Sequence, residues 1–180
     1  MFDKKVLSDI HARFRQLRSG ELADNLALQG VKYRIAWGLE SYRLKEIAED
    51  FEQNAELAEA LWEEDVRESK MLATRLFPTN ELSADKALSW VKEAKYTEIA
   101  DQVCMNLLAR MSSPKELAES LAKAEIKSSP IEIYSALKLA TRIEYKSEKI
   151  LALAEEILSG NYEIYLKTAS LWYKQIYVEE

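Results

Sequence analysis

The chain has 180 residues and a net charge of −6, with 48% apolar and 31% charged residues. This balance is typical of a globular domain with a substantial core, and it excludes a disordered chain. Only four glycines and three prolines are present, too few breakers for the many tight turns of an all-β fold. We therefore predict an all-α protein.

Targeting signals are not visible in the sequence. The single cysteine, Cys104, cannot form an internal disulfide, and no apolar stretch follows Met1 to Lys5 as it would in a signal peptide. No window of roughly 18 residues is apolar and free of charges. We expect a cytoplasmic protein that has no contact with a membrane.

Charge is distributed unevenly along the chain. Residues 1–45 carry nine Lys/Arg against five Asp/Glu, whereas residues 46–65 hold nine acids and no base. Such an acidic block repels a phosphate backbone. Any nucleic acid must therefore bind elsewhere on the molecule.

Helices are predicted by apolar residues that recur at three- and four-residue spacings. In chain order they cover residues 3–18, 21–36 (with a break point at Gly30 and an end at Gly38), 44–51, 55–64, 66–77, 83–94, 96–111, 114–124, 130–145, 147–158 and 162–177. Pro78 ends one helix. The pairs Ser113-Pro114 and Ser129-Pro130 each place a serine at an N-cap and a proline at the first helical position.

A repeat organises these helices. Leu72-Ala73-Thr74-Arg75 recurs as Leu139-Ala140-Thr141-Arg142, and Leu108-Ala109-Arg110 lies between the two copies. A period of roughly 33 residues made of two helices indicates an α-solenoid. We predict a single HEAT-like-repeat domain over 1–180, with N-terminal capping helices in 1–50 and about four helix pairs in 51–180. The pairs should form a right-handed superhelix, and the second helix of each pair should line its concave groove.

Three segments resemble a known family. Gly38-Leu39 to Ile47-Ala48 is similar to a Gly-Val…Leu-Arg-x-Ile-Ala motif. Residues 56–73 are similar to Glu-Leu-Ala…Leu-Trp followed by Glu-x-Arg…Leu-Ala, and residues 99–107 to a helix carrying Trp-Asp-x-x-Asp. These motifs are those of the DNA alkylation repair family, the HEAT-like-repeat alkylpurine DNA glycosylases.

The resemblance implies a chemistry. Family enzymes hold duplex DNA in the concave groove and hydrolyse the N-glycosidic bond of cationic alkylated purines, with no metal and no cofactor. Two Trp rings and an Asp contact the lesion: aromatic faces attract the cationic base, and the carboxylate stabilises the oxocarbenium charge and positions water. The functional Asp corresponds to Asp101, which becomes the candidate catalytic residue.

The sequence departs from the family pattern at the other lesion contacts. The Trp one turn before the Asp falls on Thr97, with Tyr96 beside it, and the second Trp aligns with Leu171, one place before Trp172. A family Arg falls near Tyr134-Ser135. We expect Tyr96, Thr97 and Trp172 to contact the ligand in a partly degenerate catalytic site.

Basic side chains supply candidate phosphate contacts. We expect them on the concave surface together with Asp101, and the acids of 46–65 away from it. They are Lys70, Lys138, Arg142, Lys167 and Lys174.

Each of these residues also has an ordinary structural reading. Asp101 could pair with Lys95 or a repeat neighbour, Trp172 could be a core residue, and the basic rows could pair with nearby glutamates. His11 stands alone, and with Cys104 as the only other soft ligand no metal site is expected.

Two hypotheses for function remain. The first is a DNA-binding protein that resembles the alkylpurine DNA glycosylases, binds duplex DNA, alkylated or unmodified, and excises bases poorly. If active, it would be a metal-independent N-glycosylase. The alternative is a non-enzymatic HEAT-like scaffold that binds a protein partner in its groove, which the net charge of −6 suits. Salt-dependent DNA binding separates the two.

Overall fold

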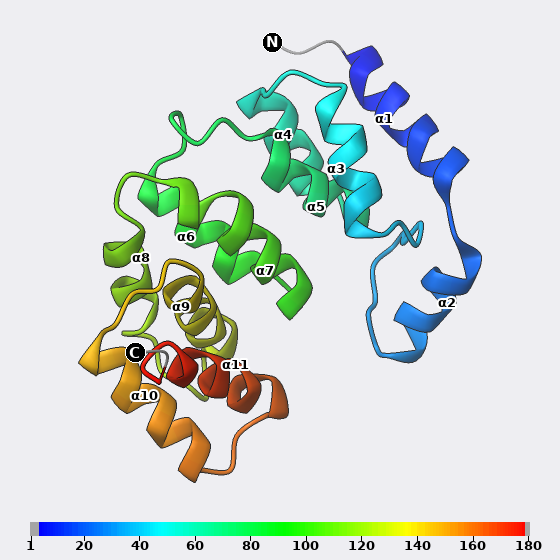
Figure 1. The fold of residues 1–180 in the computed structure, drawn as a ribbon. Helices are drawn as coiled ribbons and strands as arrows, with labels where there is room; N and C mark the ends of the chain where they lie inside the picture. Colours follow the sequence, from blue (N-terminus) through cyan, green and yellow to red (C-terminus); the bar gives the residue numbers. More distant parts are fainter. Residues whose placement is uncertain (1–3, 179–180) are drawn as a thin grey trace. The chain divides into compact units, whose positions relative to one another are not determined.

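The computed structural model describes residues 4–178. Within this range the regular structure is helical, and the only extended pairing is an isolated bridge between Ile35 and Val66 (Figure 1). The prediction of an all-α fold is therefore confirmed. The chain divides into two compact units, Met1–Glu81 and Leu82–Glu180. That both units belong to one superhelical domain stays a prediction.

The described residues of the first unit form five helices. They are α1 (Lys4–Leu17), α2 (Gly20–Leu28), α3 (Ser41–Glu49), α4 (Ala55–Glu63) and α5 (Arg67–Leu76). Helix α5 contacts both α3 and α4. Met71, Leu72 and Ala73 of α5 are buried, as are Leu61 and Trp62 of the adjoining α4.

The helix predicted at 21–36 is too long. Helix α2 ends at Leu28, and Gly30 has a φ of 85°, a left-handed conformation that glycine adopts without a steric cost. The chain then runs in an irregular segment until α3, and Ile35 forms its bridge with Val66 within this segment. Local periodicity suggested a helix here, but contacts with α5 determine the conformation.

A buried carboxylate holds this segment in place. Glu68 of α5 is fully buried and accepts hydrogen bonds from the backbone N–H groups of Trp37, Gly38 and Leu39 at 2.9, 3.0 and 3.2 Å. Its neighbour Arg67 donates to Glu68 and to the Leu39 carbonyl, each at 2.8 Å. The network satisfies buried polar groups that would otherwise destabilise the fold.

Gly38 is required at the centre of that segment. Its φ is 71°, and an added Cβ would lie 2.2 Å from the Ser19 carbonyl oxygen. Ser19 is the N-cap of α2 and also donates its backbone N–H to the Trp37 carbonyl. The absence of a side chain therefore lets the segment approach the start of α2.

At least four of the nine carboxylates of the acidic block have a partner side chain inside their own unit. Basic side chains from 1–45 pair with its carboxylates, as the uneven charge distribution allows. The pairs are Arg13 with Asp50, Arg43 with Glu46, Lys45 with Glu49, and His11 with Glu64. The positive balance of the N-terminal region thus does not by itself make a surface for nucleic acid.

The described residues of the second unit form three helix pairs. They are α6 (Ala84–Glu93) with α7 (Thr97–Asn106), α8 (Pro114–Leu121) with α9 (Pro130–Arg142), and α10 (Glu148–Ser159) with α11 (Ile164–Gln175). The second helices also contact one another in the order α7, α9, α11. Side chains from successive repeats are thereby brought together.

The predicted helix at 96–111 is divided. Helix α7 ends at Asn106, and Leu108–Arg110 forms a short 3-10 helix, so the middle copy of the repeat is not α-helical. In the outer copies Ala73 and Ala140 are fully buried, where a small side chain allows close packing.

Helix starts agree with the predicted caps. The Ser83 and Ser147 hydroxyls accept the backbone N–H groups of Lys86 and Ile150. Ser113 and Ser129 occupy N-caps before a proline at the first turn, but neither side chain makes the capping hydrogen bond.

Candidate functional site

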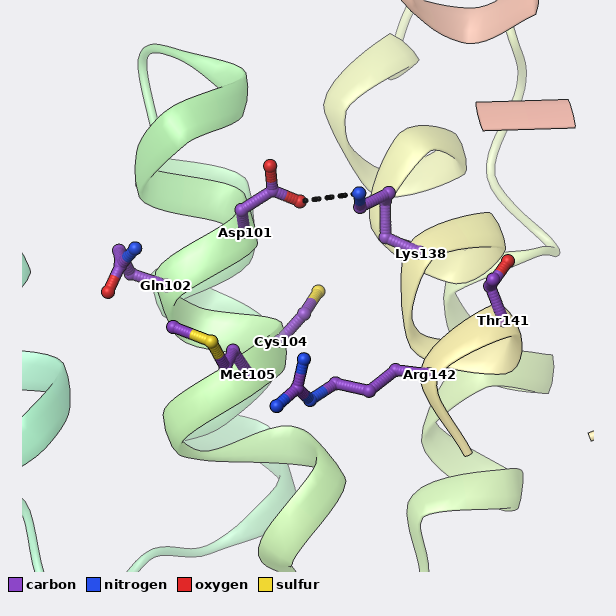
Figure 2. Close-up of a pocket in the computed structure, with 7 residues that line it drawn as sticks. All are labelled: Asp101, Gln102, Cys104, Met105, Lys138, Thr141 and Arg142. Atoms are coloured by element: carbon purple, nitrogen blue, oxygen red, sulfur yellow. Dashed lines mark ion pairs between the residues drawn. The ribbon is translucent and has the colours of Figure 1, made fainter. Parts of the chain in front are cut away.

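A pocket of about 680 Å³ lies between α7 and α9. Figure 2 shows Asp101 of α7 and Lys138 of α9 pointing toward each other across the pocket, whereas Gln102 projects from the other side of α7. Helix α7 contributes Asp101, Gln102, Cys104 and Met105, and helix α9 contributes Lys138, Thr141 and Arg142.

Asp101 is held by two partners from α9. Tyr134 donates its hydroxyl to Oδ2 at 2.9 Å, and Lys138 Nζ lies 3.6 Å from Oδ1. Tyr134 and Lys138 are one helical turn apart and so face α7 together. Burial raises the pKa of Asp101, and the nearby Lys138 ammonium and the Tyr134 hydrogen bond oppose that rise. The same desolvation, with the Asp101 charge, raises the pKa of Tyr134.

Lys138 also contacts aromatic rings. Its Nζ lies 4.3 Å from the centroid of the Trp172 ring and 5.9 Å from that of Tyr134. Tyr134 in turn meets the edge of Tyr165 of α11, with the ring centroids 5.7 Å apart. A carboxylate and two aromatic faces therefore surround a single ammonium group.

Trp172 is not a core residue. Its side chain is 46% exposed, and it contacts α9 through Lys138. Leu171 is 54% exposed and makes no such contact within residues 4–178. Although the ungapped alignment favours Leu171, it is the Trp172 ring that contacts Lys138, the ion-pair partner of Asp101.

Arg142 extends from α9 toward α7, beneath Cys104 and Met105 in the view of Figure 2. It is exposed, and its guanidinium forms no hydrogen bond or ion pair within the described part of the chain. It is thus a cation at the pocket that no internal carboxylate neutralises.

The other predicted contacts lie apart from this pocket. Tyr96 is the N-cap of α7 and Thr97 its first residue, and neither lines the pocket. Lys174 pairs with Glu155 of α10 at 3.2 Å, and Lys167, two turns earlier, lies on the same face of α11.

Lys70 belongs to the first unit. Its ammonium donates to the Trp62 carbonyl near the end of α4 and lies 4.8 Å from the centroid of the Trp62 ring. The structure thus gathers Asp101, Lys138, Arg142 and Trp172 in one place, and gives Lys70 a local structural contact.

Tyr134 and Tyr165 were not singled out as site residues by the sequence. A signal was present, since Tyr134 and Lys138 form an i, i+4 pair on one face of a predicted helix. Their shared partner, however, is on another helix. Local spacing therefore could not identify it.

No group of three or more His, Cys, Asp or Glu side chains is placed to hold a metal ion between residues 4 and 178. Over the same span, none of the helices has the length and apolar character needed to cross a membrane.

The fold and the site together define a helical-repeat protein with an aspartate–lysine ion pair between successive second helices. Residues 10–130 match the DNA alkylation repair enzyme family. This match covers about two thirds of the sequence, and the chain belongs to that family.

Other comparisons address the fold. Among curated proteins no match is found. One solved structure is similar with a TM-score of 0.76 and 16% sequence identity, over 98% of this chain and 75% of that chain. It is described as representing a new family of proteins related to the HEAT-like repeat DNA glycosylases, with affinity for branched DNA structures. At this identity the likeness establishes the HEAT-like helical fold.

Proposed function

We propose that this chain binds DNA at the pocket between α7 and α9, and that it excises alkylated purines poorly or not at all. The observation that carries the proposal is the exposed Arg142 guanidinium, which has no internal partner among the described residues. Family membership and the affinity of the similar structure for branched DNA support the same reading.

Arg142 suits a phosphate ligand. A guanidinium presents parallel N–H donors that match two phosphate oxygens, and it stays charged at all physiological pH values. Lys138 lies one turn earlier on α9 and lines the same pocket as Arg142. Its ammonium can therefore contribute a second cation to the ligand when its ion pair with Asp101 breaks. Such contacts position a nucleic acid without reading its sequence.

Poor excision is expected because the side chains that contact the lesion in family enzymes are either replaced here or already occupied by partners within the chain. Thr97 stands where the family has a Trp, and the exposed ring of Trp172 already faces Lys138. Each cation–π contact that a cationic base cannot make costs about 0.5–2 kcal/mol, or roughly two- to thirtyfold in rate. Asp101 is also occupied by Tyr134 and Lys138, which reduces its capacity to stabilise a sugar cation.

The binding test compares Arg142→Ala with Lys123→Ala. Lys123 is an exposed lysine outside the pocket, so its replacement matches the change in net charge. Fluorescence anisotropy would be recorded with a labelled duplex and a four-way junction over a range of salt concentrations. We expect salt-sensitive binding in the native chain, and for Arg142→Ala a loss of about tenfold with a salt slope smaller by about 0.9. Equal effects of the two variants would remove the pocket from the proposal.

The excision test measures release of 7-methylguanine from methylated duplex DNA by the native chain and by Asp101→Asn. We expect little or no release from either protein. Robust release that collapses in Asp101→Asn would instead establish a working glycosylase with a rearranged aromatic site.

Protein binding is the second candidate. Exposed apolar side chains on α11 favour it, with Ile164 76% and Leu171 54% exposed. Absence of DNA binding at low salt would favour this alternative over the first.

A further inference from the structure

Lys138 occupies a site that has the chemistry of an organic-cation receptor. The Asp101 carboxylate lies 3.6 Å from its ammonium nitrogen, and the faces of Trp172 and Tyr134 lie 4.3 and 5.9 Å from it. A negative charge combined with aromatic faces is the arrangement by which proteins bind cationic ligands. Asp101, Tyr134 and Trp172 are called the cage below.

We propose that Lys138 is an internal ligand of this cage, which competes with a cationic heteroaromatic ring for the same place. The inference rests on the proposed function, because it explains why a family member with a carboxylate and an exposed Trp would excise alkylated bases poorly. It assigns a restraining role to a lysine of the chain itself.

The competition is physically strong because the lysine is tethered. An attached group binds its site as an intramolecular ligand at a high effective concentration, whereas a base must lose translational freedom to enter. Two cations cannot share the cage, since like charges a few ångströms apart repel each other in a partly desolvated site. A cationic ring can therefore enter only after the ammonium has left.

The cage is nevertheless accessible to a ligand. The side chains of Asp101 and Trp172 are 36% and 46% exposed, and the adjoining pocket of about 680 Å³ is within the size range of small-molecule sites. The Lys138 side chain is 21% exposed, and its flexible stem allows the ammonium to move into solvent. The lysine therefore blocks an accessible site, not a sealed one.

The test uses nucleosides, which lack the phosphates that Arg142 would contact. The probe is 1,7-dimethylguanosine, a permanent cation, and its neutral match is 1-methylguanosine. Binding to the full chain would be followed by NMR at the Trp172 indole N–H signal, assigned with Trp172→Phe. Lys138→Ala removes the competitor, Lys138→Arg keeps a cation in the cage, and Lys138→Met is the second variant if Lys138→Ala does not fold.

We expect Lys138→Ala to bind the cationic nucleoside about two- to thirtyfold more tightly than the native chain, the range set by one cation–π contact. Lys138→Arg should remain close to the native affinity, and neutral 1-methylguanosine should gain nothing. Equal affinities of native chain and Lys138→Ala would overturn the inference, and so would an equal gain for the neutral nucleoside, which would indicate added space only. DNA binding and its loss in Arg142→Ala are measured separately, so failure of the proposed function is distinguishable.

Discussion

Replacing Asp101 with Asn should strengthen DNA binding. The substitution keeps the shape of the side chain and an acceptor for Tyr134, but removes the charge that holds Lys138 at 3.6 Å. At that separation two unit charges attract by about 1 kcal/mol with the dielectric constant of water and by about 5 kcal/mol with an effective value of 20. Both side chains are partly exposed, so the lower figure applies, and it corresponds to about fivefold in affinity.

The assay is anisotropy with labelled duplex DNA at low salt, with Asp85→Asn as the matched control. Asp85 is exposed in the first turn of α6, away from the pocket, and its replacement changes the net charge equally. The advantage of Asp101→Asn should shrink as salt is added, because exposed charges are screened. If Asp101→Asn binds no more tightly than Asp85→Asn, the ion pair does not restrain Lys138 and the reasoning is refuted.

Three further predictions concern stability, each measured by urea denaturation. Gly38→Ala should lower the free energy of unfolding by roughly 2–4 kcal/mol, because Gly38 has a positive φ and the added Cβ would clash with the Ser19 carbonyl oxygen. Gly20→Ala is the control: nothing lies within 4 Å of the new Cβ, so the free energy of unfolding should stay the same or rise by up to about 1 kcal/mol. Glu68→Ala should lower the free energy of unfolding by about 3–5 kcal/mol because it breaks a buried charged network. Replacement of the exposed Glu63 by Ala should change it by less than about 0.5 kcal/mol, and equal losses would show that Glu68 does not hold the irregular segment in place. The raised pKa of Asp101 means that the folded state binds a proton at this carboxyl more tightly than the unfolded state does. The native chain should therefore gain stability relative to Asp101→Asn as the pH falls from the raised pKa to the usual carboxyl range. A stability difference that stays constant with pH would contradict this.

Most helix positions could be predicted because the determining signals are local. Apolar spacing and the serine caps are properties of neighbouring residues, and Ser83 and Ser147 make the expected bonds. The irregular segment at 30–40 could not be predicted in the same way. Its conformation depends on Glu68, about 30 residues further along the chain, whose burial local periodicity does not reveal.

The candidate site was predictable in its residue types but not in its contacts. Asp101 was identified through the family motif, and of the two kinds of partner considered for it the structure has the repeat neighbour, Lys138 of α9, and not Lys95. The choice between Leu171 and Trp172 depends on the rotation of α11, and one residue shifts a side chain by roughly 100°. That rotation is set by packing against α9 and α10, which is a tertiary property.

Cys104 gives the protein a practical advantage for labelling experiments. Its thiol is buried beside the pocket, donates to the Ser135 carbonyl at 3.6 Å, and has a pKa raised to about 12 by burial. Because the thiolate is the reactive form, the raised pKa and the burial of the thiol both lower its reactivity at neutral pH. Since the sequence has 1 cysteine, a second one introduced by Lys123→Cys would be the only thiol that reacts readily with maleimide dyes. The native chain therefore already serves as an unreactive background for single-site fluorescence studies.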